Sequence, residues 1–412
     1  MTRIVVTGVG AITPLGIGAD TYWRGIVDGR SGISYIDAFD TSDLEVKIGG
    51  QVRGFNPRDF MDFKVAKRMD RFAQFAVAAS REAIENANLT IDDSNRERVA
   101  VMVNTGGGGI PAIGLEVENM ITKGPRSVHP LLIPVFAPNM ASCQVSMAFG
   151  IHGPSVTSVA ACAAGVQAFI DAVNLIKRGD ADVAITGGTE AGLTQVAIAS
   201  LASMTALSRR NDPPEAASRP FDSARDGFVF SEGSAIMVLE TEEHALARGA
   251  NIIAEVVGGS MTSDAYHITA PAPGGAGAAR AMKRALARNE IAPESVDFVA
   301  AHATATDVGD IAETEALKSA FGDHAYKLSI SANKGAIGHL LGAAGATSSM
   351  NAVLAIRDGI IPPTINLTNQ DPRCDLNYTP LVAVRRPVQV SIANGFGFGG
   401  QNAVCIFRAY NS

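Results

Sequence analysis

Cysteines are few in this chain, and their spacing excludes the chemistry that paired cysteines support. The 412 residues include four, Cys143, Cys162, Cys374 and Cys405. They lie far apart and form no CxxC pair and no Cys/His pattern of the kind that binds a metal. We therefore expect neither disulfide bonds nor a metal site.

Charged residues are also scarce, at 18% of the chain against 47% hydrophobic residues. This balance suits a packed globular α/β protein and argues against disorder, and the net charge of −7 disfavours nucleic-acid binding. From Ser127 to Ile170 there is no Lys, Arg, Asp or Glu, yet Pro, Asn and Gly interrupt every apolar run. The segment is therefore not a membrane span, and we expect it to be buried inside the protein or between two copies of it.

Two nucleotide-binding patterns are present only in part. In TGVGAITPLG, Thr13 stands where a dinucleotide loop needs its third glycine, and TGGGG at Thr105 to Gly109 is not followed by GK[ST]. We therefore expect no nucleotide cofactor. The start, MTRIVVTGVG, has neither the basic region nor the cleavage site of a signal peptide, so we expect a cytoplasmic protein.

Short apolar runs alternate with helical patterns along the chain, which is typical of a largely parallel sheet covered by helices. The expected strands are RIVVTGVG, RVAVMVN, NIIAEVVGGS and VDFVAAHA, and the expected helices lie near residues 20–28, 58–88, 276–288 and 310–321. The chain is longer than a single core usually supports, and the rhythm restarts after about Ala250. We predict two similar halves, residues 1–250 and 251–412.

The segment SVTSVAACAAGVQAFIDAVNLIKRG predicts a strand that turns into a helix beginning near Cys162. A thiol on the first turn of a helix lies at the positive end of the helix dipole, which favours the thiolate. The small neighbouring residues leave room for a substrate. However, a free cysteine among alanines is more often a small core residue, so this segment alone leaves both interpretations open.

Two further segments place histidines at strand-to-helix turns. His302 enters a Thr-rich loop before a helix that contains Glu313, while Lys334 and His339 lie in a Gly-rich turn before an uncharged helix of small residues. The glycine-rich loop at Asn394 to Asn402 could present an N–H group to an oxyanion. A lone histidine is usually a core group and a glycine loop usually a hairpin turn, but ligands in α/β sheets do collect at the carboxyl ends of strands.

Taken together, AACAAG at Cys162, HATAT at His302, NKGAIGHLLGAAG at Asn333 and NGFGFGGQN at Asn394 resemble the β-ketoacyl-[acyl-carrier-protein] synthases, specifically the elongating type II enzymes of the thiolase-like superfamily. The likeness covers nearly the whole chain. It implies an α/β thiolase fold, with two similar βαβαβαββ halves in five αβαβα layers, in a homodimer without a cofactor. It also implies condensation of an acyl-[acyl-carrier-protein] with malonyl-[acyl-carrier-protein] to give 3-oxoacyl-[acyl-carrier-protein] and CO2 in fatty acid elongation.

The resemblance also implies roles for individual residues. Cys162 matches the acylated nucleophile, and His302 and His339 match the pair that binds the malonyl carbonyl. Lys334 and Glu313 match the supporting charged residues, and the N–H groups of Cys162 and Phe398 match the oxyanion hole. The remaining matches bind substrate: Thr304 and Thr306 along the pantetheine arm, Gly107 and Leu201 on the acyl tunnel, and Thr269 and Phe396.

A basic group is the candidate docking site for an acidic carrier protein. Its members share one face of the predicted 58–88 helix or lie near it, and they are Lys64, Lys67, Arg68, Arg71 and Arg126. A solvated helix face is the alternative interpretation.

Related functions differ from this pattern at single positions. A thiolase needs a second cysteine within Asn394 to Asn402, a chain-length-factor subunit is expected to lack Cys162, and initiating synthases carry Asn in place of His339. Ala303 and Ala305 replace residues of the commoner HGTST motif and put only the shape of the pantetheine channel in doubt. A ketosynthase of a polyketide or specialised lipid pathway remains the alternative, because the same residues would perform the same reaction there.

Overall fold

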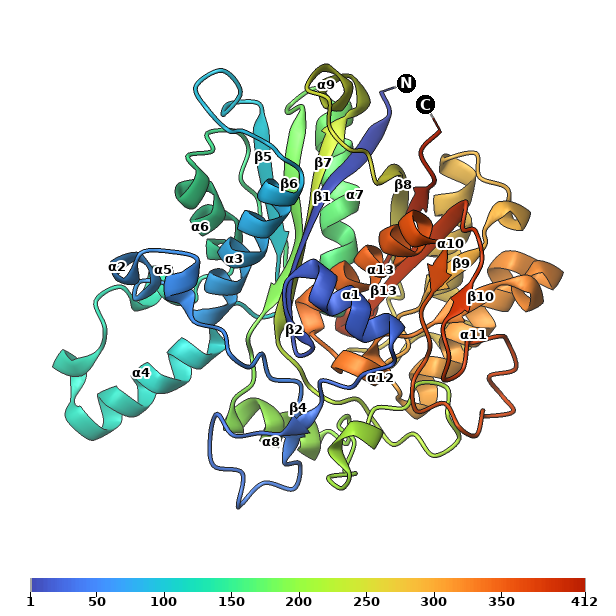
Figure 1. The fold of residues 1–412 in the computed structure, drawn as a ribbon. Helices are drawn as coiled ribbons and strands as arrows, with labels where there is room; N and C mark the ends of the chain where they lie inside the picture. The colour runs from blue at the N-terminus through green and yellow to red at the C-terminus, as the bar shows by residue number, and fades with distance from the viewer. Residues whose placement is uncertain (1, 412) are drawn as a thin grey trace.

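The computed structural model describes residues 2–411 as one α/β body (Figure 1). Its helices are α1 (Ala19–Val27), α2 (Phe63–Ala66), α3 (Arg71–Asn86), α4 (Ile110–Lys123), α5 (Leu132–Phe136), α6 (Met140–Phe149), α7 (Ala164–Lys177), α8 (Gln195–Ser203), α9 (Glu242–Ala247), α10 (Ala276–Arg288), α11 (Asp307–Phe321), α12 (Lys334–Ile337) and α13 (Ala344–Asp358). Its strands are β1 (Ile4–Thr13), β2 (Gly16–Ile17), β3 (Ser34–Tyr35), β4 (Ile48–Gly49), β5 (Val99–Asn104), β6 (Val183–Glu190), β7 (Gly233–Thr241), β8 (Ala254–Ser263), β9 (Phe298–Ala300), β10 (Ser329–Ser331), β11 (Ile360–Ile361), β12 (Val384–Arg385), β13 (Val390–Gly397) and β14 (Gln401–Arg408).

The strands form two sets with the same order. In the first half, the order is residues 155–159, which bridge to β5, and then β5, β6, β7 and β1. In the second half, the corresponding order is β10, β9, β13, β14 and β8. Corresponding neighbours have the same direction, since β5–β6 and β9–β13 are parallel whereas β7–β1 and β14–β8 are antiparallel. Pairing of β1 with β8 joins the two sets.

Helices cover both sides of each set of strands. Helices α7 and α13 pack against each other and against both sets of strands, so they form a central layer (Figure 1). Helices α3 and α6 cover the outer face of the first half, and α10, with α11 packed on it, covers that of the second. The small residues of α13 allow this close packing, and the helix is buried from Ala344 to Ala355.

The predicted fold of two similar halves in five layers is confirmed, and most expected elements lie where the sequence placed them. The single helix expected over residues 58–88 is wrong, because the chain breaks between α2 and α3. Asp62 caps α2 and Asp70 caps α3, each accepting a backbone N–H with its carboxylate. The strand expected before Cys162 is reduced to two isolated bridges, one with β5 and one with Thr105 directly after it. The boundary at residue 250 stays a prediction.

No helix within residues 2–411 is long and apolar enough to cross a membrane. Among the same residues, no group of three or more His, Cys, Asp or Glu side chains is arranged to hold a metal ion.

Candidate active site

Cys162 lies in a strained turn that leads into the central layer. It occupies a 3₁₀ turn over Ala161–Ala163, which precedes α7, and its side chain is buried. Ala161 adopts a left-handed φ of 46°. The corresponding turn of the other half, before α13, has Leu341 at φ 42°. Because alanine and leucine rarely adopt this conformation, the surrounding packing must hold both turns.

Two imidazoles converge on the sulfur. His339 Nε2 lies 3.0 Å from Cys162 Sγ, and the ring centroids of His302 and His339 are 5.5 Å apart at an interplanar angle of 84°. The edges of Phe228 and Phe396 pack against His339 and His302 respectively. The rings are therefore held by apolar neighbours, and His339 places its Nε2 at the thiol.

Burial keeps both imidazoles neutral. It is the main cause that lowers the pKa of His302 and His339 well below the usual value, and the positive charge of Lys334 adds to it. A neutral imidazole can donate one hydrogen bond from Nε2 without carrying a charge. The two rings therefore suit the stabilisation of an oxygen anion without protonating a nearby carbanion.

Burial is also the main influence on the protonation state of the Cys162 thiol. It raises the pKa of Cys162 to about 12, against the opposing effects of Lys334 and the backbone N–H groups of Phe398 and Cys162. The expectation that the helix terminus holds a thiolate is therefore wrong for the free protein. A proton must leave Sγ during nucleophilic attack, and His339 Nε2 is the nitrogen within reach.

Glu313 holds the main chain at His302 in place. Its two carboxylate oxygens accept the backbone N–H groups of His302 and Ala303, at 2.9 and 2.7 Å, and Asn394 Nδ2 donates to it at 2.9 Å. Burial raises the pKa of Glu313 and lowers the pKa of Lys334 to about 8. Lys334 thus supplies a buried charge beside the histidines, and no protein acceptor within residues 2–411 binds its Nζ.

The glycine loop delivers a second N–H group to the nucleophile. A Cβ added at Gly397 would lie 3.0 Å from Cys162 N and from Ala160 O, so a side chain there would crowd the turn that carries the nucleophile. The next residue, Phe398, directs its backbone N–H towards Sγ, as does Cys162 itself. Two N–H groups at one sulfur form the donor pair that a tetrahedral oxyanion needs.

A cavity of about 360 Å³ leads from the surface to these groups. The predicted site residues that line it are Cys162, His302, His339, Glu313, Thr269, Thr304, Thr306, Phe396 and Phe398. Lys334 lies fully buried outside the lining. Gly107 and Leu201 are not lining residues: a Cβ on Gly107 would meet Ile110 Cδ1 at 2.7 Å, and Leu201 packs in the cluster that contains Phe228.

Glu190 was not identified from the sequence, although it contacts several parts of the site. Its carboxylate is buried, and one oxygen accepts the N–H groups of Gly106 and Gly342 at 2.8 and 3.0 Å. Burial raises its pKa to about 7. Glu190 thus ties the TGGGG loop to the turn that follows His339. The signal in the sequence that could have identified Glu190 is a single acidic residue at the end of an apolar strand, VAITGGTE.

The basic residues do not share one helix. Lys64 is in α2, Lys67 and Arg68 follow it, and all three are exposed. Arg71 starts α3, where it pairs with the buried Glu232 at 2.9 Å and donates to Val52 O. Arg126 is exposed on the turn after α4. The predicted common face is therefore wrong, and Arg71 already has protein partners.

Comparison with known proteins identifies the family. Residues 1–245 match the N-terminal domain of β-ketoacyl synthases and residues 253–368 match the C-terminal domain. The chain is 48% identical to 3-oxoacyl-[acyl-carrier-protein] synthase 2 of Synechocystis sp., over 99% of this chain and 98% of that protein. It is 44% identical to the protein of the same name from Staphylococcus aureus, over 100% and 99% of the two chains.

Solved structures agree with this relationship. The ishigamide ketosynthase/chain length factor superimposes with a TM-score of 0.94 at 35% identity, and a β-ketoacyl synthase from Burkholderia phymatum with a TM-score of 0.92 at 33% identity; each covers 100% of both chains. A type II polyketide ketosynthase, solved in complex with its acyl-carrier protein, gives a TM-score of 0.90 at 32% identity over 100% of both chains. The chain belongs to the β-ketoacyl synthase family, with the thiolase fold that its two matching halves display.

Proposed function

We propose that this protein extends an acyl-[acyl-carrier-protein] by decarboxylative condensation with malonyl-[acyl-carrier-protein] in fatty acid elongation. The observation that carries the proposal is the convergence of one thiol, two neutral imidazoles and two backbone N–H groups at the inner end of one cavity. The relatives of the highest identity reported above bear the name of this activity, which supports the same assignment.

In the first half-reaction Cys162 accepts the acyl group. Sγ attacks the thioester carbonyl while its proton passes to His339 Nε2, 3.0 Å away. The carbonyl oxygen becomes an anion between the N–H groups of Cys162 and Phe398. When the tetrahedral intermediate collapses, the carrier sulfur leaves and takes the proton, so the imidazole returns to its neutral form.

In the second half-reaction the two histidines act on the malonyl group. Its thioester oxygen accepts Nε2–H bonds from His302 and from His339, which for this step carries its single ring proton on Nε2 instead of Nδ1. Loss of CO2 leaves the electron pair as an enolate on that oxygen. The α-carbon then attacks acyl-Cys162, the same two N–H groups stabilise the new oxyanion, and Sγ leaves as a thiolate that takes a proton from water. The products are 3-oxoacyl-[acyl-carrier-protein] and CO2.

The polyketide alternative predicts a different product pattern from the same site. A type II polyketide ketosynthase is among the similar structures, although at 32% identity. An assay with saturated acyl-[acyl-carrier-protein] and malonyl-[acyl-carrier-protein] separates the two functions. A single extension to a 3-oxoacyl product supports fatty acid elongation, whereas repeated extension without reduction supports the polyketide role.

We propose that carrier docking uses the exposed cations at and after α2, with Arg126. Lys67 Nζ lies 4.3 Å from the ring centroid of Phe63, so the group combines charge with an exposed apolar surface. Arg71 is left out because its pair with Glu232 occupies it. A carrier protein with acidic side chains fits such a surface.

Reversing the charge of Lys64 and Lys67 to Glu should raise the Michaelis constant for carrier-bound substrate and weaken its dependence on salt. Kinetics with an acyl-pantetheine thioester, which lacks the carrier, should not change. Lys283→Glu with Arg284→Glu, on the outer face of α10, is the matched control. Equal effects of the two double variants at low salt would contradict docking at α2.

A homodimer is proposed from the exposed apolar surface of the first half. Helix α4 has no buried residue and projects from the body (Figure 1). It carries Ile113, Leu115, Val117, Met120 and Ile121 with more than a third of each side chain exposed. The uncharged segment continues this surface at Ile133, Met147, Val156 and Val159. This apolar surface lies beside the edge strand β5, where a second copy of the chain can pack against it. Light scattering, which measures the mass of the protein in solution, tests for the dimer.

The acyl tunnel is proposed to pass Gly107 and Leu201, where a side chain at 107 would narrow it. Gly107→Ile should shorten the longest primer accepted, because each excluded methylene gives up about 0.8 kcal/mol of burial. Gly107→Ala controls for the loss of glycine. An unchanged preference between about eight and about eighteen carbons in an active Gly107→Ile variant would place the tunnel elsewhere.

We also propose a cytoplasmic location, which the four free cysteines support.

A further inference from the structure

The loop that carries Thr304 and Thr306 is strained. The alanines on either side of Thr304 adopt left-handed backbone, with φ 29° at Ala303 and φ 66° at Ala305. Residues with a Cβ are unfavourable there, so surrounding contacts must hold the loop in place. Because Thr304 and Thr306 line the cavity, whatever holds the loop also sets the shape of the cavity wall.

Besides Glu313, which accepts the N–H of Ala303, two buried side chains hold this loop by its main chain. Asp310 Oδ1 accepts the N–H of Ala305 at 3.1 Å, and its other oxygen accepts the N–H of Phe221 at 2.7 Å. Arg225 donates from Nε to Thr306 O at 3.1 Å and from Nη2 to Asp307 O at 2.9 Å. The segment around residues 221–227 therefore anchors the loop from one side.

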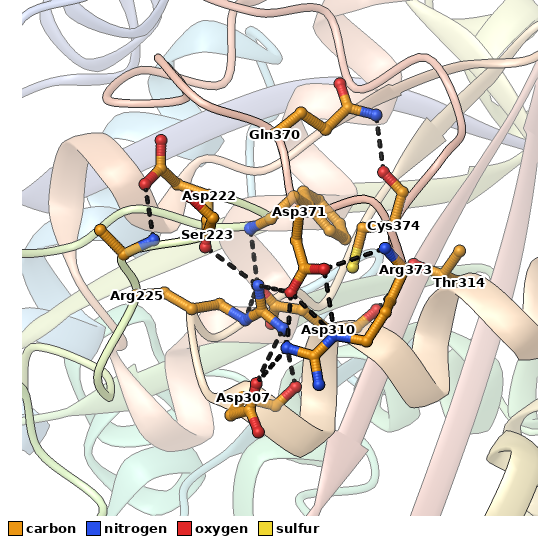
Figure 2. Close-up of polar contacts among 12 residues, drawn as sticks. Asp222, Ser223, Arg225, Asp307, Asp310, Thr314, Gln370, Asp371, Arg373 and Cys374 are labelled. Atoms are coloured by element: carbon orange, nitrogen blue, oxygen red, sulfur yellow. Dashed lines mark hydrogen bonds and ion pairs between the residues drawn. The ribbon is translucent and has the colours of Figure 1, made fainter.

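Arg225 is itself fixed by carboxylates. Its side chain is 1% exposed, and it contacts Asp371 at 2.8 Å, Asp307 at 3.3 Å and Asp310 at 3.8 Å. Figure 2 shows Arg225 and Arg373 between Asp307 and Asp371, each of which accepts from both guanidinium groups. A planar guanidinium has donors in several fixed directions at once, which an ammonium group cannot reproduce.

We propose that Arg225 is a positioning residue that fixes the strained Thr304–Thr306 loop and thereby sets the affinity for the arm of the thioester substrate. The proposal rests on the proposed function and on the expected role of Thr304 and Thr306 along the pantetheine arm. The competing role for a buried ion-pair cluster is general stability, in which case the fold weakens but the cavity wall does not move.

Arg248 provides a matched control for that competing role. It is also largely buried, pairs with the buried Glu240 and donates to the main-chain oxygens of Ala87 and Asn88. It is not a residue of the cavity lining. Arg225→Met and Arg248→Met therefore remove comparable interactions, the first at the loop and the second away from it. Arg225→Lys is the milder variant to use if Arg225→Met does not fold.

The kinetic experiment uses an acyl-pantetheine thioester and malonyl-pantetheine with the full-length protein. The Michaelis constants should rise by about tenfold in Arg225→Met, the size expected if the displaced loop loses about one hydrogen bond to the substrate arm, while kcat changes little. Arg248→Met should lower the melting temperature without raising the Michaelis constants. Adding Ala305→Gly to Arg225→Met should restore part of the affinity, because glycine adopts the left-handed conformation without strain.

Hydrogen exchange of the Ala303–Gly309 amides tests the loop independently of any reaction. These amides should exchange faster in Arg225→Met than in Arg248→Met. Equal exchange in the two variants, or unchanged Michaelis constants in an active Arg225→Met protein, would overturn the proposal. A wild-type protein that forms no condensation product would instead refute the proposed function, and the exchange result would still decide whether Arg225 holds the loop.

Discussion

Cys162→Ala is expected to abolish condensation while the protein remains folded. Loss of the nucleophile removes the acyl-enzyme, and comparable losses in other covalent enzymes reach about 10⁶-fold in rate. The fold should survive because alanine fills nearly the same buried volume as cysteine. The measurement is product formation from carrier-bound substrates, together with intact-protein mass after incubation with the acyl donor alone.

Cys405→Ala is the matched control for this variant. Cys405 is also a buried free thiol, and burial raises its pKa to about 12 as well, but it lies in the core of β14 away from the imidazoles. The control should keep both activity and the mass increase. An acyl group found on Cys143, Cys374 or Cys405 of the wild-type protein would contradict the assignment of Cys162.

His302→Ala and His339→Ala are expected to lose malonyl decarboxylation by about 10² to 10³ each, the usual cost of one oxyanion donor. The two variants should differ in the first half-reaction. Only His339 lies within 3.0 Å of Sγ, so its removal should slow acylation, whereas His302→Ala should acylate normally. Separate measurements of acyl transfer and of CO2 release distinguish these effects.

The pKa values add a pH dependence to this prediction. Both histidines have a pKa well below 6.5, so they stay neutral as the pH falls from about 8 to about 6 and should not cause a loss of decarboxylation there. A decline in that range that disappears in His302→Ala or His339→Ala would show that one ring does gain a proton. Acylation that fails only in His302→Ala would exchange the roles assigned to the two rings.

The sequence predicted most of the fold, because the element signals are local, and the candidate catalytic residues that it marked lie together around one cavity, although their roles stay predictions. Strand-to-helix turns, small residues in α13 and the glycine loop mark the positions of His302, His339 and Phe398 within short segments. The helix break before α3 was missed although Asp62 and Asp70 are good cap residues, because the apolar spacing of Met69, Phe72 and Phe75 continues across the break.

Contacts between distant segments could not be predicted from one sequence. Arg225 reaches Asp371 across 146 positions, and Glu190 binds the N–H of Gly342 across 152. Neither pairing leaves a periodic pattern. The state of the thiol was missed for a related reason, because its burial depends on elements of both halves and outweighs the helix terminus that the local sequence showed.

A single-turnover experiment tests the account most directly. The protein is first acylated with a saturated acyl-[acyl-carrier-protein], and malonyl-[acyl-carrier-protein] is then added while intact mass, CO2 and carrier products are followed. The account predicts that the acyl group on Cys162 disappears at the rate at which CO2 and one equivalent of 3-oxoacyl-[acyl-carrier-protein] appear. Release of CO2 and of 3-oxoacyl product while the acyl group stays on Cys162 would contradict it.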